Sequence, residues 1–300
     1  MENASHPTSR LRIDLAYDGT DFHGWARQKE GPDGPIRTVQ EVVEDALSTI
    51  LRVPVQLTVA GRTDAGVHAA GQVAHFDIPL ECLDQRTLNG DPHRLVRRLG
   101  RFLPEDIRVD EVAFAPAGFD ARFSALSRRY VYRITTHPGG ALPMRVRDTA
   151  TWIKPVEVTA MQEVAHALVG LNDFAAFCKP RPHATTIRDL QSFVWRDSST
   201  SMEPNLYEAE VIADAFCWNM VRALVGACLA VGEGRRDLSW AAVLLQEKQR
   251  SSQVPLAPAR GLTLMGVTYP PDEELALRSA ATRGMRDASE LDEEPGPSVG

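Results

Sequence analysis

Residues 10–17 read Arg10-Leu11-Arg12-Ile13-Asp14-Leu15-Ala16-Tyr17, with bulky apolar side chains at every second position from Leu11. This period of two predicts a β-strand with one buried face. A glycine-containing loop over 18–37 follows. Thr38 and Glu41 then form a capping box in front of apolar residues that recur at helical spacing as far as Leu51. The chain is therefore expected to open with a strand, a loop and an amphipathic helix.

The rest of the chain has more strand patterns than helix patterns. Alternating or β-branched runs predict strands at 55–59, 71–78, 107–114, 129–136, 187–195, 206–213 and 262–269. Helical spacing predicts helices at 92–102, 161–169, 216–231 and 238–248. The helix at 216–231 is apolar nearly all round, which predicts burial. Because helices separate groups of strands in both halves, the fold class is α+β with antiparallel or mixed sheets.

A boundary near residue 115 is expected to divide the chain into two α/β subdomains, 10–115 and 116–270. Residues 1–9 are polar and expected to be disordered. Residues 271–300 carry 8 acidic and 3 basic side chains without a sustained apolar period, which predicts an acidic disordered tail. This tail supplies −5 of the net charge of −7 and leaves −2 for the rest. Nucleic-acid binding then depends on where the positive charges cluster.

Composition excludes several classes of protein. With 43% hydrophobic and 24% charged residues among 300, the body of the chain is globular and not a collagen or a coiled coil. The longest nearly apolar stretch, 220–231, is interrupted by Arg222 and is shorter than the roughly 20 residues that cross a bilayer. The N-terminus has no apolar segment typical of a secretory signal, so a cytoplasmic protein without a membrane partner is expected.

The cysteines give no sign of a structural site. The four are Cys82, Cys178, Cys217 and Cys228, and no two of them form a CxxC pair. Neither a zinc site nor a disulfide framework is expected. Most of them are expected to be buried free thiols.

One carboxylate stands among small residues in the segment 61–72. Asp64 lies between glycines and alanines, two residues after Arg62. Small neighbours let a planar ligand approach the backbone, and a flanking cation keeps the carboxylate ionised. The same composition is typical of a tight turn in which an aspartate caps a backbone amide. Spacing alone leaves both interpretations open.

A metal site built from Asp64, His68 and His75 is not expected. Asp64 and His68 would need a helix to share one face, and Gly66 opposes a helix there. No GxGxxG or GxxxxGK[ST] run indicates a nucleotide cofactor either.

Six groups of residues occur in a recognisable order over about 250 residues. They are Ala16-Tyr17-Asp18-Gly19-Thr20 with Phe22-His23-Gly24-Trp25-Ala26-Arg27-Gln28; Thr38-Val39-Gln40; Gly61-Arg62-Thr63-Asp64-Ala65-Gly66-Val67-His68; Phe119-Asp120-Ala121-Arg122-Phe123-Ser124-Ala125 with Arg128-Arg129-Tyr130-Val131-Tyr132; Asn219-Met220-Val221-Arg222 with Leu224-Val225-Gly226; and Gly261-Leu262-Thr263-Leu264. In this order they resemble the tRNA pseudouridine synthase A family.

The resemblance implies an isomerase that converts uridine to pseudouridine at positions 38, 39 and 40 of the tRNA anticodon stem-loop. No metal or organic cofactor is implied. The N1 glycosidic bond breaks, the uracil turns, and C5 joins ribose C1′. The resemblance also implies two α/β subdomains joined into one sheet with the active cleft between them, and a homodimer with one tRNA across both subunits.

The resemblance also assigns roles to individual residues. Asp64 matches the essential aspartate, which would add to ribose C1′, add to uracil C6 or take a proton from C2′. Arg222 matches the arginine that pairs with this aspartate. Tyr130 matches the tyrosine that stacks on the uracil and helps to remove the C5 proton, and Leu262 the apolar residue on the other face of the base. Arg62 matches the arginine that fills the gap left by the flipped nucleotide.

A further prediction rests on spacing alone. Four arginines of the expected helix at 92–102 fall on one face, the densest basic surface in the chain: Arg94, Arg97, Arg98 and Arg101. Contacts to RNA phosphates are expected there. Further candidates for phosphate contacts are Arg128, Arg129, Lys179 and Arg181.

Two other functions compete with the isomerase. A tRNA-binding protein without catalytic activity would keep the basic face but would have no need of Asp64, Tyr130 and Arg222 together. A metal-dependent phosphoester hydrolase would use Asp64 with two histidines, and activity that survives EDTA would exclude it.

Overall fold

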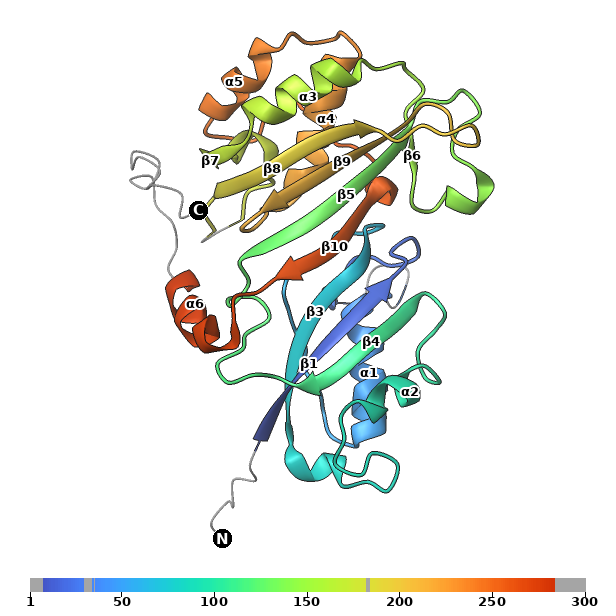
Figure 1. Ribbon diagram of the computed structural model, residues 1–300, viewed down its shortest axis with the longest axis vertical. Helices are drawn as coiled ribbons and strands as arrows, with labels where there is room; N and C mark the ends of the chain where they lie inside the picture. The colour runs from blue at the N-terminus through green and yellow to red at the C-terminus, as the bar shows by residue number, and fades with distance from the viewer. Residues whose placement is uncertain (1–7, 30–33, 35, 182–183, 284–300) are drawn as a thin grey trace. The chain divides into compact units, whose positions relative to one another are not determined.

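The computed structural model describes residues 8–29, 34, 36–181 and 184–283 (Figure 1). The chain divides into two compact units. Unit 1 runs to Tyr130 and includes Ala259–Thr282, and unit 2 comprises Val131–Pro258. Residues 116–130 and 259–270 thus belong to unit 1, whereas the sequence patterns assigned them to the second subdomain. The late strand joins unit 1 because β10 (Leu262–Thr268) pairs with β3 (His68–Pro79).

A mixed sheet forms the frame of unit 1. Its other strands are β1 (Thr8–Tyr17), β2 (Thr58–Val59) and β4 (Ile107–Phe114). β1 lies between β3 and β4 and is antiparallel to both, β2 is antiparallel to β3, and β10 is parallel to β3. Leu11, Ile13 and Leu15 are fully buried, which confirms the buried face predicted for the first strand.

Helices α1 (Val39–Leu51) and α2 (Arg94–Leu99) contact each other in unit 1, and α2 also packs on β4. The Thr38 hydroxyl accepts a hydrogen bond from the backbone N–H of Glu41 at 3.4 Å, which confirms the predicted N-cap. α2 is shorter than the predicted helix at 92–102, because the chain continues from Gly100 in turns. A 3-10 turn, η1 (Leu80–Leu83), follows β3.

The prediction of disordered tails is wrong where the structure describes them. Residues 272–282 form a 3-10 turn, η5 (Asp272–Glu274), and helix α6 (Leu275–Thr282). Leu275 is buried in a cluster with Phe119 and Ala121, and this packing holds the helix to unit 1. The expected N-terminal tail also ends earlier, because β1 begins at Thr8. Residues 1–7 and 284–300 lie outside the described residues.

A second group of strands and helices forms unit 2. β5 (Ser127–Thr135) enters it at Val131, and the strand order is β5, β9 (Leu206–Ala213), β8 (Ile187–Asp197) and β7 (Gly170–Asp173), with β6 (Ala150–Thr151) beside β5. The helices are α3 (Val158–Ala167), α4 (Met220–Gly232) and α5 (Ser239–Gln246). α3 packs on α4 and β8 (Figure 1). Both units therefore confirm the predicted mixture of helices with antiparallel and mixed sheets.

α4 is almost entirely buried, as predicted for the apolar stretch at 216–231. Only Arg222 of its residues is half-buried instead of buried. No described helix is long and apolar enough to cross a membrane.

Two of the four cysteines correct the prediction of free thiols. Cys178 and Cys217 form a disulfide across 39 residues of sequence, whereas Cys82 and Cys228 are buried free thiols. The short 3-10 turn η3 (Ala175–Phe177) ends at Cys178, and the segment before α4 brings Cys217 to it. Sequence spacing could not show this pairing, because it depends on how two loops of unit 2 meet.

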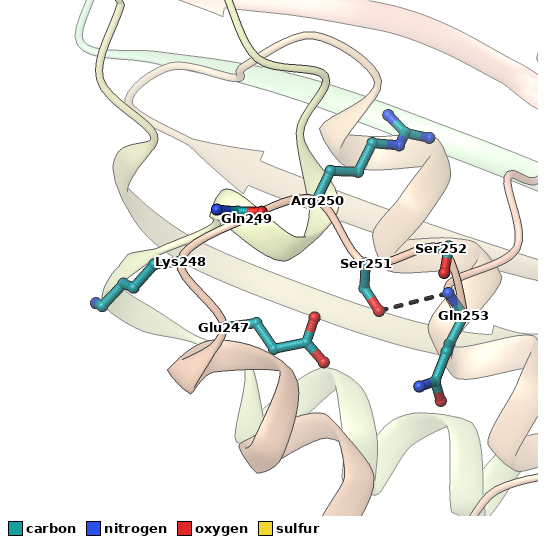
Figure 2. Close-up of a pocket in the computed structure, with 7 residues that line it drawn as sticks. All are labelled: Glu247, Lys248, Gln249, Arg250, Ser251, Ser252 and Gln253. Atoms are coloured by element: carbon teal, nitrogen blue, oxygen red, sulfur yellow. Dashed lines mark hydrogen bonds between the residues drawn. The ribbon is translucent and has the colours of Figure 1, made fainter.

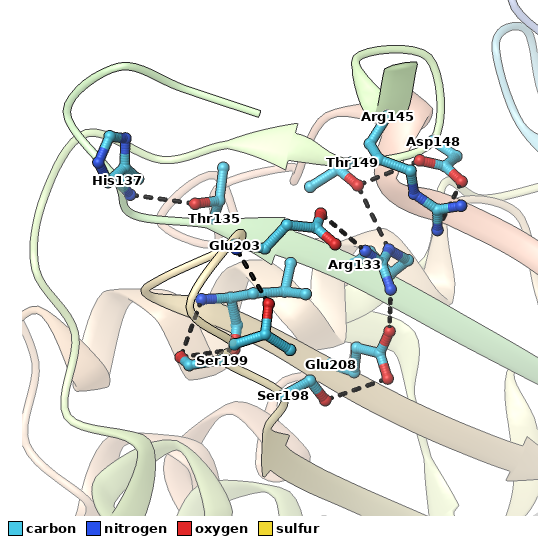
Figure 3. A network of polar contacts seen from close by, with 12 residues as sticks. Arg133, Thr135, His137, Arg145, Asp148, Thr149, Ser198, Ser199, Glu203 and Glu208 are labelled. Atoms are coloured by element: carbon cyan, nitrogen blue, oxygen red, sulfur yellow. Dashed lines mark hydrogen bonds and ion pairs between the residues drawn. The ribbon is translucent and has the colours of Figure 1, made fainter. Parts of the chain in front are cut away.

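A polar network joins the strands of unit 2 to the neighbouring segment 145–149 (Figure 3). Arg133 of β5 forms ion pairs with Glu208 of β9 and with Glu203, the latter at 3.2 Å. Its Nε also donates to the Thr149 hydroxyl at 3.3 Å. These contacts fix the register of β5 against the β8–β9 hairpin, and none of the predicted site residues takes part in them.

Candidate active site

The loop that carries Asp64 connects β2 to β3 and is held from inside unit 1. The backbone N–H of Trp25 donates to the Thr63 carbonyl at 3.0 Å, and that of Gly66 donates to the Phe22 carbonyl at 3.2 Å. The Tyr17 and Thr63 hydroxyls lie 2.7 Å apart. The loop is therefore a fixed platform and not a loose turn.

Gln72 supports the start of the same loop. It is fully buried, and its Nε2 donates to the Gly61 carbonyl at 2.8 Å and to the Tyr17 hydroxyl at 3.2 Å. Burial raises the pKa of Tyr17 to about 12, so this hydroxyl keeps its proton and can continue the chain of hydrogen bonds. Sequence patterns did not single out Tyr17 and Gln72 for this role. A glutamine within a buried strand was the only signal for it.

Asp64 and Tyr130 both belong to unit 1. A Cβ added at Gly61 would lie 4.0 Å from the Tyr130 hydroxyl, so this hydroxyl lies beside the start of the loop that carries Asp64. Asp64 is half-buried on the loop, and the Tyr130 side chain is buried. Burial raises the pKa of the Tyr130 phenol well above its ordinary range, and the negative charge of Asp64 adds to the rise while Arg128 opposes it. The phenol is therefore protonated at neutral pH.

Leu262 is buried at the start of β10, beside the loop. A Cβ added at Gly66 would lie 3.2 Å from the Ala259 Cβ, so the loop touches η4 (Ala259–Gly261) directly before Leu262. Arg62 is exposed on the same loop. Unit 1 thus supplies four of the predicted site residues.

Arg222, the fifth, lies in the first turn of α4 in unit 2. Its Nε donates to the Ala257 carbonyl at 2.7 Å, and the Ala257 N–H donates back to the Arg222 carbonyl at 3.1 Å. This pair of bonds fixes the side chain against the segment that leads to Pro258. Its predicted pairing with Asp64 stays a prediction.

Glycines allow the loop to lie against its neighbours. A Cβ added at Gly19 would lie 2.0 Å from the Val67 carbonyl oxygen, and one at Gly24 would lie 2.7 Å from the Thr63 carbonyl oxygen. Gly24 also has a φ of +93°, which favours glycine. The glycines at 19 and 24 are thus required by close approach of backbone to backbone.

We expect Gly19→Ala to lower the free energy of unfolding by about 1–3 kcal/mol, because the new methyl group would push the Val67 carbonyl out of place. Turnover should fall more than stability accounts for, since Val67 lies three residues from Asp64. Urea unfolding and a turnover assay check this. Gly266→Ala is the matched control, because a Cβ there meets no atom within 4 Å. Equal effects of the two substitutions would contradict the account.

Two of the arginines predicted to contact phosphates, Arg128 and Arg98, form hydrogen bonds within the protein instead of being fully exposed. Arg128 is buried and donates to the carbonyls of Ala60 at 2.9 Å and Arg122 at 2.7 Å, so its prediction as a phosphate contact is wrong. Arg98 is half-buried and donates to Gln85 and Thr87.

The other arginines of this set differ in exposure. Arg94 is exposed but lies 3.6 Å from Asp91 in an ion pair, and Arg129 is half-buried. Arg97 and Arg101 are exposed, and they remain the best candidates on this face. Lys179 and Arg181 are also exposed, and both stack over the Trp218 ring.

No group of three or more His, Cys, Asp or Glu side chains in the described part of the chain is arranged to hold a metal ion. His68 and His75 instead each accept a backbone N–H at Nδ1, from Gly19 and from Ala121 respectively, both at 3.0 Å. The two rings therefore serve as internal hydrogen-bonding groups.

A hollow of about 490 Å³ lies in unit 2 (Figure 2). One continuous segment lines it, Glu247 to Gln253, and the Gln253 N–H donates to the Ser251 hydroxyl at 3.4 Å. Its lining includes none of the predicted site residues. The hollow is therefore no part of the candidate site.

Comparison with known proteins gives consistent matches. The model of a family described as tRNA pseudouridine synthase matches residues 15–124 and 164–270. The chain is 64% identical over 278 residues to tRNA pseudouridine synthase A of Corynebacterium glutamicum, which covers 93% of this chain and 95% of that protein. Proteins of the same name from Mycobacterium leprae and Frankia casuarinae are 50% and 54% identical, with 92% of this chain and 95% of each relative covered.

Proposed function

Because the chain belongs to the tRNA pseudouridine synthase family, we propose that it isomerises uridine to pseudouridine in tRNA, with Asp64 as the catalytic carboxylate. The observation that carries the proposal is that backbone hydrogen bonds fix the loop of Asp64 and that the Tyr130 hydroxyl lies beside Gly61 at the start of this loop. A tight turn on the surface would need neither the buried support of Gln72 nor a buried tyrosine beside it.

The reaction needs a carboxylate and no redox partner. The N1–C1′ bond breaks, a C5–C1′ bond forms, the C5 hydrogen leaves as a proton, and N1 gains one. Asp64 in its ionised form can start this sequence by attack on C1′, by attack on C6 or by removal of the C2′ proton. The three routes share the requirement that Asp64 is charged, and the pairing with Arg222 would favour that form.

Tyr130 cannot act as a simple base that takes up the C5 proton. Because its phenol is protonated at neutral pH, it can accept the C5 proton only if it passes on its own proton. Its ring can stack on the uracil while Leu262 covers the other face of the base. We therefore assign it stacking together with proton relay.

Further parts of the proposal rest on the resemblance. They are action at positions 38, 39 and 40 of the anticodon stem-loop, a flipped target nucleotide with Arg62 in the vacated space, a homodimer and a cytoplasmic location. Removing a base from a paired stem costs a few kcal/mol, which contacts to the vacated space can offset.

The experiment that tests the function is a map of pseudouridine in tRNA from cells with and without this protein. We expect pseudouridine to disappear from positions 38, 39 and 40 in its absence and to return with the wild-type gene but not with Asp64→Asn. Unchanged tRNA in the deletion strain would contradict the proposal. Loss of pseudouridine that Asp64→Asn restores would favour the binding protein without catalysis.

The exposed pair Arg97 and Arg101 should contribute to tRNA affinity and not to the chemical step. Contacts to phosphates release counterions. Replacing both arginines by glutamine should therefore reduce the slope of log affinity against log salt concentration by up to about two in magnitude. The maximal rate at saturating tRNA should stay unchanged. Filter binding at several salt concentrations checks the slope.

Arg108→Gln with Arg196→Gln is the charge-matched control, because both side chains are exposed, at 75% and 65%. If the variant lacking Arg97 and Arg101 shows the wild-type slope, these two arginines contact solvent and not phosphates, and the prediction is wrong.

A further inference from the structure

His68 occupies a junction between three segments of unit 1. It is the first residue of β3, directly after the loop of Asp64, and its side chain is buried. Nδ1 accepts the backbone N–H of Gly19 at 3.0 Å, from the segment that follows β1. Nε2 lies 3.2 Å from the carbonyl oxygen of Arg260, in the turn before β10.

These two contacts indicate which nitrogen of the His68 ring has the hydrogen. Since Nδ1 accepts the Gly19 N–H, the ring hydrogen is on Nε2 and is donated to the Arg260 carbonyl. Asp18 Oδ1 lies 3.2 Å from Nδ1 and is itself bound by the N–H and hydroxyl of Thr20. A single side chain therefore connects two backbone segments that are far apart in the sequence.

Close contacts between the same segments show how little space the junction leaves. His68 is in register with Thr263 in the parallel pair of β3 and β10. Gly66 lies against Ala259, and a Cβ added at Gly19 would lie 2.0 Å from the Val67 carbonyl oxygen. Loss of the ring would thus leave a gap at the point where the loop, the Gly19 segment and the start of β10 meet.

We propose that His68 is a positioning residue that fixes the distance between Asp64 and Leu262 by bonding Gly19 on one side and Arg260 on the other. The inference rests on the proposed function, in which Asp64 acts on the nucleotide and Leu262 covers the base. His68 touches neither in this role. It holds the two elements that do, and displacement of a reacting group by about 1 Å can cost 10²-fold in rate.

Three substitutions of His68 test its hydrogen bonds to Gly19 and to Arg260 separately. His68→Asn places an amide oxygen near the position of Nδ1 but cannot reach Arg260. His68→Gln can reach Arg260 with its terminal amide but offers nothing at the position of Nδ1. His68→Ala removes both contacts.

His75 is the matched control. It lies on the same strand, is equally buried, and accepts the Ala121 N–H at Nδ1 at the same distance of 3.0 Å, but it supports a segment outside the loop. His75→Ala should therefore lower the unfolding midpoint without changing kcat.

The assay measures kcat by release of tritium from tRNA labelled at uridine C5, together with the tRNA Kd and the urea unfolding midpoint. We expect His68→Ala to lower kcat at least about tenfold with Kd within about threefold, and Asn and Gln each to recover part of the loss. A His68→Ala enzyme with wild-type kcat would overturn the inference. So would equal losses of kcat in His68→Ala and His75→Ala at equal losses of stability.

If His68→Ala does not fold, His68→Asn and His68→Gln take its place in the assay. Wild-type kcat in both variants, or losses of kcat equal to that of His75→Ala at equal losses of stability, would then overturn the inference. An inactive wild-type protein would overturn the proposed function itself. An active wild-type protein with unaffected His68 variants would overturn only the positioning role.

Discussion

Asp64→Asn should abolish turnover while tRNA affinity stays within a few fold of wild type. The two side chains have the same shape, so the substitution removes only the charge that each of the three routes requires. The expected loss is at least about 10²-fold in kcat, since nucleophilic or proton-transfer roles contribute this much or more. A single-turnover assay at saturating tRNA measures it, and filter binding measures the Kd.

Asp110→Asn is the control for this result. Asp110 lies on β4 in the same unit and forms an ion pair with Arg108 at 2.7 Å, with 38% of its side chain exposed. The Asp110→Asn variant should keep full activity. Turnover of Asp64→Asn above about 1% of wild type would contradict the catalytic role of Asp64.

Tyr130→Phe should bind tRNA nearly as well as wild type and form product far more slowly. Phenylalanine keeps the stacking face, which is worth about 1–3 kcal/mol per base. It removes the only atom of this side chain that can relay the C5 proton. We expect kcat to fall at least about tenfold with little change in Kd.

Isotope substitution sharpens the test of Tyr130. If proton loss from C5 becomes slow in Tyr130→Phe, deuterium at uridine C5 should lower the rate of the variant more than that of wild type. A fully active Tyr130→Phe would leave Tyr130 with stacking alone. Tyr132→Phe is the matched control, because Tyr132 lies on the same strand and donates to the Pro258 carbonyl at 3.0 Å.

Local patterns predicted the parts of the fold that depend on neighbouring residues. The alternation from Leu11 gave a strand with a buried face, and Thr38 gave a true N-cap, because both are fixed within a few residues. The apolar stretch around α4 was predicted to be buried for the same reason.

Features that depend on distant segments could not be predicted in this way. The disulfide of Cys178 with Cys217 and the burial of Arg128 each depend on which loops meet in space. α6 was missed because it has one buried apolar side chain, Leu275, and its other attachments are hydrogen bonds with the distant residues Ser124 and Ala125. The roles of Asp64 and Tyr130 came from the resemblance, since composition and spacing alone left open whether Asp64 was a functional carboxylate or an ordinary turn residue.

The most direct measurement of the central claim is tritium release from a tRNA transcript labelled at uridine C5 and incubated with purified protein. Isomerisation places C5 on the ribose and must release its hydrogen to water, whereas binding or hydrolysis of the phosphodiester backbone does not. We expect release from a transcript with uridines at 38 to 40, no cleavage of the RNA, and no release with Asp64→Asn. Absence of release from wild-type protein, or equal release with Asp64→Asn, would contradict it.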